Sequence, residues 1–465
     1  MFQRTGLRRH DVSAEFTADA YERARDALQA QLDASREPVR LDKRTSNLFR
    51  PRERGGERLD VAAFSGVLEV DTEAGTADVL GMTTYEQLVA ATLPHGVMPL
   101  VVPQLKTITI GGAVAGLGIE STSFRSGLPH ESVLEMEILT GAGEVVVARP
   151  DNEHAELYWA FPNSYGTLGY ALRLLIEVEP VRPYVALRHI PYTSAEACFG
   201  DLERFCAARE VDGEQVDFLD GTVFAPDELY LTVGTFTDSA PYVSDYTGRD
   251  IYYRSIRRRE RDHLSVHDYL WRWDTDWFWC SRAFGAQNPV LRRLWPDRWL
   301  RSDVYWKLVA FEHRFGVKRR VDRLLRRPEV EPIVQDVEVP VDRSAAFLDH
   351  LFRDVGLSPV WLCPLRQRTE APWDLYPLDP DLLYVNFGFW GGVTIASGDA
   401  EGDRDRRLER TVGELDGRKS LYSTAYYAPD EFWELYGGER YWEVKRRYDP
   451  DGRLLDLYDK CVRNK

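Results

Sequence analysis

The stretch from residue 107 to residue 123 constrains the fold of this chain more than any other segment. It reads TITIGGAVAGLGIESTS, an apolar run that leads into four glycines and a group of serines and threonines. Residues without a Cβ let main-chain N–H groups approach a phosphate closely, and hydroxyl side chains add further donors. The same composition also suits a tight loop packed against a sheet. We interpret the stretch as a binding loop for a diphosphate.

Two common phosphate-binding motifs do not describe this loop. The glycines at 111, 112, 116 and 118 do not form the spacing GxGxxG, so a Rossmann dinucleotide fold is not predicted. The sequence also contains no GxxxxGK[ST], so a nucleoside-triphosphate P-loop is not predicted either. The diphosphate site therefore belongs to another kind of fold.

Composition and charge limit the class of protein. A chain of 465 residues is expected to form about two or three packed units, and 44% hydrophobic with 29% charged residues is typical of a soluble globular protein. The net charge of −16 makes nucleic acid a poor partner. The five cysteines form no CxxC pair, so we predict no disulfide framework, no metal site and a cytoplasmic location. We expect neither a signal peptide nor a membrane-spanning helix.

The pattern of apolar residues predicts an α+β fold. Helical spacing covers residues 14–34 and 84–93, and short strands are predicted at 67–70, 77–79, 134–139 and 144–148. The segment Pro180-Val181-Arg182-Pro183 ends this region, and further strands are predicted at 229–236 and 382–389. The expected units are an N-terminal helical segment (1–39), a binding domain (40–183), a substrate domain (184–414) and a C-terminal segment (415–465) that returns to the binding domain.

A second glycine segment completes a recognisable order of motifs. After the Gly-Gly loop come a hairpin with GAGE at 141–144, the string LYWAF at 157–161 and GTLG at 166–169. In this order the sequence resembles the FAD-binding domain of the vanillyl-alcohol oxidase (PCMH-type) superfamily. It is similar in particular to the delta(24)-sterol reductase group, on the strings GIESTS at 118–123, Gly127-Leu128, KSLY at 419–422, EFW at 431–433 and LYDK at 457–460.

The resemblance implies a two-part FAD domain and a cap-like substrate domain that covers the isoalloxazine ring. Many members hold flavin covalently through a His or Cys in these loops; neither loop contains one, and the nearest is His130, so non-covalent FAD is implied. Glu120 also suits a structural hydrogen bond within the loop. The resemblance implies a first cofactor loop of Arg44, Thr45, Ser46 and Asn47, which departs from the GGGHS pattern of the oxidases. The second loop would contribute Thr109, Ile110, Gly111, Gly112, Ala113, Gly116, Gly118, Ile119, Glu120, Ser121 and Ser123. The other side of the cofactor would be lined by Gly166, Thr167 and Gly169.

A flavin accepts or delivers a hydride, while the protein supplies orientation, a proton donor or acceptor and control of water. Reduction of an unactivated alkene needs an acid that protonates one carbon while the other receives hydride. Each candidate for this chemistry also suits an ordinary packing or surface role, although a cation near the flavin is common in the family, which favours Lys419. The candidates are Lys419, Tyr422, Tyr384, His313 and Tyr426.

Two further segments suggest contact with lipid. Seven of the 13 tryptophans lie between residues 271 and 306, which suits a satellite core, an apolar tunnel or an aromatic rim at a bilayer. Residues 313–327 form a predicted basic amphipathic helix, which suits either charge pairing with acidic neighbours or docking on an anionic membrane.

The leading hypothesis is a reductase of a lipid C=C bond. Bacterial relatives of the sterol reductase group reduce a 10-methylene acyl chain to the 10-methyl branched (tuberculostearic-type) chain beside a methyltransferase, and the resemblance favours this reaction, with NADPH as electron donor through FAD. One alternative is an oxidase or dehydrogenase of an alcohol, sugar or sterol with the same fold. Another is a flavin-free, non-catalytic lipid-binding partner protein. We expect a cytoplasmic protein that contacts the membrane peripherally.

Overall fold

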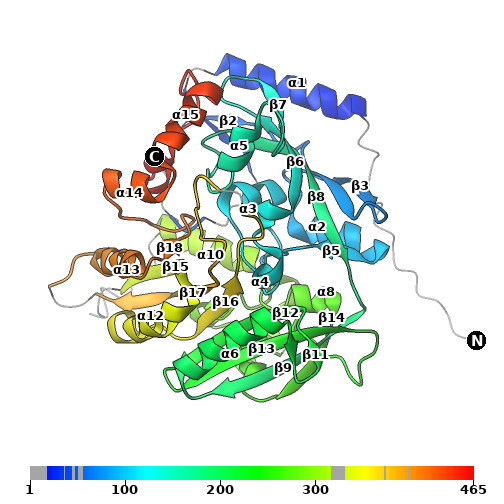
Figure 1. Cartoon of the computed structure of the whole chain (residues 1–465), viewed down its shortest axis with the longest axis vertical. Coiled ribbons are helices and arrows are strands. Elements are labelled where there is room, and N and C mark those ends of the chain that lie inside the picture. Colours follow the sequence, from blue (N-terminus) through cyan, green and yellow to red (C-terminus); the bar gives the residue numbers. More distant parts are fainter. Residues whose placement is uncertain are drawn as a thin grey trace, which may run out of the picture.

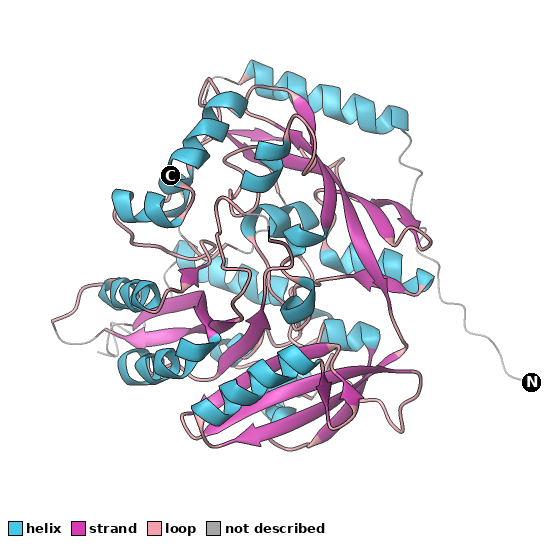
Figure 2. Ribbon diagram, in the orientation of Figure 1, coloured by secondary structure: helices cyan, strands magenta, loops and turns pink. Residues whose placement is uncertain are grey.

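The structure is a computed structural model that describes residues 18–35, 37–43, 48–50, 56–248, 250–315, 330–370, 373–395 and 398–465, with the side chains of 310–315 excepted. The first predicted cofactor loop, Arg44 to Asn47, lies outside these residues, as does most of the predicted basic helix. The strands gather in two bodies, one in the upper and one in the lower half of the molecule (Figure 2), with the short helices α3 and α4 between them (Figure 1). The predicted α+β fold is confirmed.

The first body is built on a six-stranded sheet in which all pairings are antiparallel. The strand order is β3-β4-β8-β6-β7, and β5 also pairs with β8. The four strands and the helix predicted between residues 67 and 148 are confirmed here. The elements are β3 (Val67–Asp71), β4 (Thr76–Leu80), α2 (Tyr85–Thr92), η1 (Leu93–His95), β5 (Val97–Pro99), α3 (Ile110–Gly116), α4 (Ser123–Ser126), η2 (Pro129–Ser132), β6 (Val133–Leu139), β7 (Val145–Ala148), α5 (Ala155–Ala160) and β8 (Tyr170–Pro180).

The second body is built on an eight-stranded antiparallel sheet. The prolines at 180 and 183 lie where the chain passes from the last strand of the first sheet into this one, and the two strands predicted in the region are confirmed. In spatial order the strands are β14 (Arg261–Ser265), β9 (Tyr184–Tyr192), β13 (Glu228–Thr237), β12 (Phe218–Ala225), β16 (Val360–Leu365), β17 (Tyr384–Thr394), β15 (Val330–Pro340) and β18 (Arg418–Lys419).

Helices cover these sheets and connect them. The predicted N-terminal helix is confirmed as α1 (Ala18–Ala34), whose Leu28 and Leu32 are buried against the first body. Two small two-stranded sheets are β1 (Val39–Leu41) with β2 (Glu57–Leu59), and β10 (Glu210–Val211) with β11 (Glu214–Gln215). The remaining helices are α6 (Ala195–Ala208), α7 (Tyr252–Ile256), α8 (Val266–Leu270), η3 (Cys280–Phe284), α9 (Pro289–Leu294), η4 (Asp297–Trp299), α10 (Ser302–Phe315), η5 (Val341–Arg343), α12 (Ser344–His350), η6 (Leu351–Val355), α13 (Asp403–Glu414), α14 (Pro429–Leu435), α15 (Gly438–Tyr448) and α16 (Leu457–Cys461).

The glycine-rich stretch is partly helical, which corrects the expectation of a loop. Residues 110–116 form α3, and the Thr109 side chain caps it by accepting a hydrogen bond from Gly112 N–H at 3.2 Å. Gly111 N–H donates to the carbonyl oxygen of Gly81 at 2.9 Å, and a Cβ on Gly111 would stand only 2.7 Å from that oxygen. Each glycine costs a helix about 1 kcal/mol relative to alanine. Close approach of two main chains explains why glycine is required at this position.

Arg272 joins the two bodies. Its side chain is 1% exposed, and it pairs with Glu120 after α3 at 3.1 Å and with Asp220 on β12 at 2.8 Å. The ring face of Tyr269 lies 4.0 Å from the guanidinium carbon, a cation–π contact. The Tyr269 hydroxyl in turn lies 2.9 Å from Ser121 Oγ. The segment after α3 is therefore fixed to the second body by a desolvated ionic network.

The tryptophan-rich tract is an irregular wall and not a strand. Residues 271–279 form turns, and both Trp277 and Phe278 have positive φ angles, 45° and 58°. Successive left-handed residues cannot continue an extended chain, so the tract forms no strand at Trp277 and Phe278. The tryptophans between residues 271 and 279 belong to the core that spans both bodies.

Substitution of the two glycines Gly111 and Gly200 tests the close main-chain contact. Gly111→Ala is expected to lower the free energy of unfolding by about 1–3 kcal/mol, because the new Cβ overpacks against a main-chain oxygen. Gly200 lies on the exposed side of α6, and no atom lies within 4 Å of the place that a Cβ would take, so Gly200→Ala is expected to stabilise the protein by about 0.5–1 kcal/mol. Chemical denaturation measures both; equal stability of the two variants would contradict the packing argument.

Candidate active site

Three main-chain donors are available directly after α3. The chain leaves this helix at Leu117 with φ 76° and ψ 160°, and within the described residues the N–H groups of Leu117, Gly118 and Ile119 have no acceptor. A left-handed non-glycine residue costs about 1–3 kcal/mol and is typical of ligand sites. By contrast, Ile110 N–H donates to Thr83 O and Gly111 N–H to Gly81 O. The main-chain donors available for a phosphate therefore follow α3, within the stretch 107–123 that the sequence predicted, and do not lie at the start of the helix.

A second strained turn lies against the end of α3. Asn163, Tyr165 and Gly166 all have positive φ angles, and Tyr165 N–H donates to Ala115 O at 2.7 Å. A Cβ on Gly116 would lie 3.2 Å from the Tyr165 ring, so this glycine provides room for the ring. The buried Ser164 and Tyr165 hydroxyls have no partner within the described residues. Because buried polar groups are nearly always hydrogen-bonded, two such hydroxyls at a glycine turn indicate a ligand-facing surface.

Positive side chains gather at this turn in an otherwise acidic protein. Arg50 is 4% exposed, and its guanidinium lies 4.9 Å above the Tyr165 ring. One of its nitrogens donates to Leu421 O, whereas Nε and Nη2 have no acceptor among the described residues. Burial, followed by the charge of Arg50, lowers the pKa of Lys460 to about 7. Lys43 lies apart from this cluster, at the start of α3, where its Nζ is 2.9 Å from Thr109 Oγ1. This positive cluster complements a diphosphate.

Comparison with known proteins decides the cofactor. Residues 23–149 match the model of the FAD binding domain. The chain carries an FAD binding domain. It is 27% identical over 413 residues to the Delta(24)-sterol reductase of Homo sapiens, with 85% of this chain and 76% of the relative covered. The Delta(24)-sterol reductase of Arabidopsis thaliana is 25% identical over 454 residues, with 88% and 77% covered. Cytokinin dehydrogenase 6 of Oryza sativa subsp. japonica is 28% identical over 424 residues, with 86% and 77% covered.

The protein is an FAD-dependent oxidoreductase related to the delta(24)-sterol reductases, which confirms the resemblance seen in the sequence. The orphaned donors of Arg50, Ser164 and Leu117–Ile119 fit a dinucleotide with a diphosphate. Arg50 and Lys460 lie outside the contacts implied by the sequence. The position of Arg50 soon after residues 44–47 is the signal that could have pointed to it.

Several implied cofactor contacts have a structural role within the protein. Thr109 Oγ1 caps α3 and accepts from Lys43, Thr167 Oγ1 donates to Ser164 O at 2.8 Å, and a Cβ on Gly169 would collide with Ile138 at 2.6 Å. The other residues have polar groups with partners inside the protein or a glycine required by packing, so the structure adds no support for them as polar contacts: Thr109, Ile110, Gly111, Gly112, Ala113, Ser121, Ser123, Thr167 and Gly169. Glu120 Oε2, by contrast, is buried without a partner among the described residues. The contacts that the structure leaves open are Gly116, Gly118, Ile119, Glu120 and Gly166, together with residues 44–47.

A carboxyl pair on β15 is the second feature that the sequence analysis missed. Asp336 and Glu338 point to the same side of the strand because they are two residues apart. Asp336 Oδ1 accepts from Asn386 Nδ2 at 3.1 Å, and Glu338 accepts from the Tyr376 hydroxyl and from Ser420. Burial raises the pKa of Asp336 to about 7 and that of Glu338 to about 8. Both carboxyls therefore hold a substantial fraction of protons at neutral pH.

The predicted catalytic side chains do not meet at one point. The Tyr422 hydroxyl accepts from Trp390 Nε1 at 2.9 Å and contacts Asp336, so Tyr422 belongs to the carboxyl cluster. Lys419 is fully buried and donates to Glu409 and to Thr424 O, both at 2.5 Å, so it is no free cation for a flavin. Tyr384 Oη accepts from Asp379 N–H at 3.2 Å, which closes a turn.

The two other candidates give no support for a catalytic role. The ring of Tyr426 lies under Arg406 at 4.6 Å and packs against Gly402, a contact that is purely structural. The backbone of His313 belongs to α10, and its side chain lies outside the described residues.

An aromatic wall leads to the carboxyl cluster. We use this name for Phe278 and its neighbours Trp273, Trp361 and Trp390, whose ring centroids lie 4.8, 5.4 and 4.5 Å from that of Phe278. Phe49 stacks on Trp277 at 5.5 Å and meets Tyr422 edge-on at 5.7 Å. Since Phe49 precedes Arg50, the segment that supplies Arg50 to the positive cluster also contacts Trp277 and Tyr422. The arrangement places apolar surface between a cofactor site and a pair of protonated acids.

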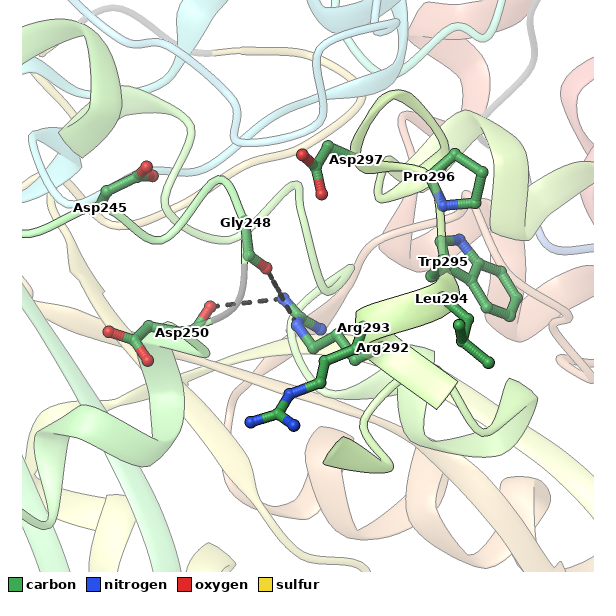
Figure 3. Close-up of a pocket in the computed structure, with 9 residues that line it drawn as sticks. All are labelled: Asp245, Gly248, Asp250, Arg292, Arg293, Leu294, Trp295, Pro296 and Asp297. Atoms are coloured by element: carbon green, nitrogen blue, oxygen red, sulfur yellow. Dashed lines mark hydrogen bonds between the residues drawn. The ribbon is translucent and has the colours of Figure 1, made fainter. Parts of the chain in front are cut away.

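A separate surface hollow has no link to this chemistry. It has a volume of about 720 Å³ and is shown in Figure 3. There Arg292 donates to Gly248 O at 2.6 Å and pairs with Asp276 at 2.7 Å, so its charge is already neutralised. The residues that line it are Asp245, Gly248, Asp250, Arg292, Arg293, Leu294, Trp295, Pro296 and Asp297.

Arg50→Gln tests the assignment of the positive cluster. We expect the dissociation constant for FAD to rise about 10-fold to 100-fold, because a hydrogen bond to a charged group contributes about 1.5–3 kcal/mol. Flavin fluorescence during titration of the apoprotein measures the constant. Arg204→Gln, on the exposed side of α6 in an ion pair with Asp201, is the matched control and is expected to bind FAD like the unmodified protein. Unchanged affinity in Arg50→Gln would remove Arg50 from the site.

Lys419→Ala separates a structural from a cofactor role. Removing one member of the buried pair with Glu409 is expected to destabilise the protein by about 3–5 kcal/mol, because it leaves a carboxylate buried without its cation. The molecules that remain folded are expected to bind FAD with unchanged affinity. Thermal melting of the apoprotein and of the FAD-loaded protein gives both quantities, and a normal melting temperature with weakened FAD binding would reverse the assignment.

Proposed function

We propose that the protein reduces a carbon–carbon double bond in a lipid, with non-covalently bound FAD and NADPH as the electron donor. The observation that carries this proposal is the aromatic wall that ends at the protonated pair Asp336 and Glu338. An apolar substrate fits the wall, and reduction of an isolated alkene consumes a proton. The relatives named as Delta(24)-sterol reductases support the same direction of reaction.

The substrate that we propose is a 10-methylene acyl chain, reduced to a 10-methyl branched chain. Such a chain has no ring system and fits between flat aromatic side chains through dispersion contacts alone. When bound and reduced, FAD would supply the hydride for one alkene carbon. A methyltransferase that installs the methylene group is the class of enzyme that must supply this substrate, and we propose it as a partner.

The residues of this chain position the reactants and exclude water. The donors of Leu117–Ile119, Arg50 and Lys460 hold the diphosphate, and Gly116 with the Tyr165 ring shapes the adjoining surface. Phe49 and Trp390 border the space beside Tyr422 with apolar rings. Water is kept from the reacting carbons by these rings, which favours hydride transfer to carbon over loss of the hydride to oxygen or solvent.

An oxidase or dehydrogenase is the second candidate, and the likeness to Cytokinin dehydrogenase 6 of rice favours it. Such an enzyme removes a hydride from a substrate carbon and needs a base that accepts a proton. The raised pKa values of Asp336 and Glu338 argue for an acid in this place, because both groups retain their protons near neutral pH.

Exposed apolar residues supply a surface for a lipid bilayer. Among the described residues, no helix has the length and apolar character needed to cross a membrane. On α9 and η4, however, Val290, Leu291, Leu294 and Trp299 are 67%, 47%, 77% and 49% exposed. Arg293 and Arg298 beside them are exposed and form no ion pair with described residues. We propose that this patch docks on an anionic membrane, from which the substrate is drawn.

A direct assay tests the reaction. The FAD-loaded protein is mixed without oxygen with NADPH and vesicles of a 10-methylenestearoyl phosphatidylglycerol, and a Δ24-unsaturated sterol is offered in parallel. We expect NADPH oxidation and an acyl product heavier by two hydrogens, measured by mass spectrometry. Reduction of the sterol alone would support the alkene chemistry but replace the substrate. Peroxide formation from an alcohol in air, without NADPH oxidation, would favour the oxidase.

Vesicle flotation tests the membrane surface. The unmodified protein is expected to float with vesicles rich in phosphatidylglycerol and to remain in solution with neutral phosphatidylcholine vesicles. Leu294→Asp is expected to weaken binding at least about tenfold, because burying a charged group in the interface costs more than about 1.4 kcal/mol. Val147→Asp, at another partly exposed apolar position on β7, is the control. Equal binding of both variants would contradict the assignment.

A further inference from the structure

The carboxyl group of Asp336 borders the aromatic wall. Its partner across the β15–β17 ladder is Gly388. A Cβ at Gly388 would lie 2.7 Å from Asp336 Oδ1 and 2.6 Å from the ring of Trp390. The glycine therefore provides the room in which the carboxyl and the indole lie side by side. Asp336 and Trp390 also retain partial exposure, unlike the neighbouring Glu338, which has none.

Neutral groups hold this carboxyl in place. Asn386 Nδ2 donates to Oδ1 at 3.1 Å, and Tyr422 forms a second side-chain hydrogen bond with Asp336. The Tyr422 hydroxyl is itself fixed by Trp390 Nε1 at 2.9 Å, and the main chain of Tyr422 is tied to Phe49 N–H at 2.9 Å. The orientation of Asp336 is thus set by the wall and by the segment that leads to Arg50.

No cation neutralises Asp336 among the described residues. On the neighbouring strand β18, Lys419 is opposite Val337 but is paired with Glu409. Glu338, two residues along β15, is occupied by Tyr376 and Ser420. The groups that face Asp336 from β17 and from residues 420–422 are Asn386, Trp390 and Tyr422. Without an ion pair, burial dominates, so the carboxyl keeps its proton to about pH 7.

We propose that Asp336 is the acid that protonates the alkene carbon during reduction; this inference rests on the function proposed above. The π bond of the substrate breaks as one carbon takes the Asp336 proton and the other takes a hydride from the reduced flavin, which is the co-reactant. The electron pair of the broken O–H bond stays on the carboxylate. Asp336 then regains a proton from solvent, so the net change is the addition of two hydrogens to the alkene.

Asp336→Asn tests this role in the FAD-loaded protein, with 10-methylenestearoyl phosphatidylglycerol vesicles as probe. We expect alkene reduction to fall about 100-fold to 10,000-fold, the usual contribution of general acid catalysis. Reduction of the bound flavin by NADPH without lipid and the melting temperature are expected to stay unchanged. Asp405→Asn, at another buried carboxyl on α13 whose pKa is also raised by burial, is the carboxyl-to-amide control and is expected to retain alkene reduction. A normal alkene rate in Asp336→Asn would overturn the proposal.

A spectroscopic readout is independent of turnover. The infrared difference spectrum between the FAD-loaded unmodified protein and Asp336→Asn, both without substrate, is expected to contain the carbonyl band of one protonated carboxyl group. This band is expected to disappear as the pH rises through about 7, whereas the band of Glu338 is present in both proteins. The alkene rate of the unmodified protein is expected to fall over the same pH range, because deprotonation removes the acid. Absence of the band from the difference spectrum would contradict the proposal. If the unmodified protein reduces no alkene, the proposed function itself is wrong, and the assignment of Asp336 as its acid is wrong with it.

Discussion

The position of the segment after α3 depends on one buried cation. Arg272 lies between Glu120 and Asp220 with almost no exposure, so three charges have been removed from water at the junction of the two bodies. Such a network is costly to desolvate and contributes to stability only when it is complete. Its geometric effect is direct: Glu120 is next in sequence to Ile119, whose amide is one of the three unsatisfied donors. The same contact that joins the bodies therefore sets the direction of these donors.

Charge distribution then selects the ligand. The chain carries a net charge of −16, yet Arg50 and Lys460 come together where main-chain donors are unsatisfied. On the opposite side of Tyr422, carboxyl groups without cations retain their protons. A dinucleotide with a negative diphosphate and a neutral apolar chain are thus matched by two different environments, one cationic and one uncharged, separated by aromatic rings.

Local patterns were sufficient to predict much of the fold from the sequence. Short apolar runs broken by turn residues predicted the hairpins at 67–79 and 134–148. Helical spacing predicted the helix at 84–93, whose buried side is formed by Tyr85, Leu88, Val89 and Thr92. The prolines at 180 and 183 indicated where the chain passes from the first sheet to the second. The helical character of residues 110–116 was missed, because two adjacent glycines reduce helix propensity and the compensating contact with Gly81 comes from a distant strand.

The candidate site was predicted less completely, because its residues are brought together by long-range pairing. Lys419 had the right chemistry, but its partner Glu409 on α13 could not be recognised before the helix was placed. Asp336 and Glu338 could not be recognised as buried from the sequence, because polar residues that alternate along a strand normally face solvent. Only the pairing of β15 with β17 and β18 shows that this side is interior.

The contact between residues 48–50 and 421–422 has a consequence for the order of assembly. Phe49 N–H donates to Tyr422 O, Arg50 donates to Leu421 O, and the charge of Arg50 contributes to the lowered pKa of Lys460. Synthesis proceeds from the amino end, so the first half of the cofactor surface leaves the ribosome long before its complement exists. Long-range closure of this kind is slow relative to local folding. Flavin loading is thereby expected only after synthesis has passed residue 460, so cofactor binding acts on a late folding step.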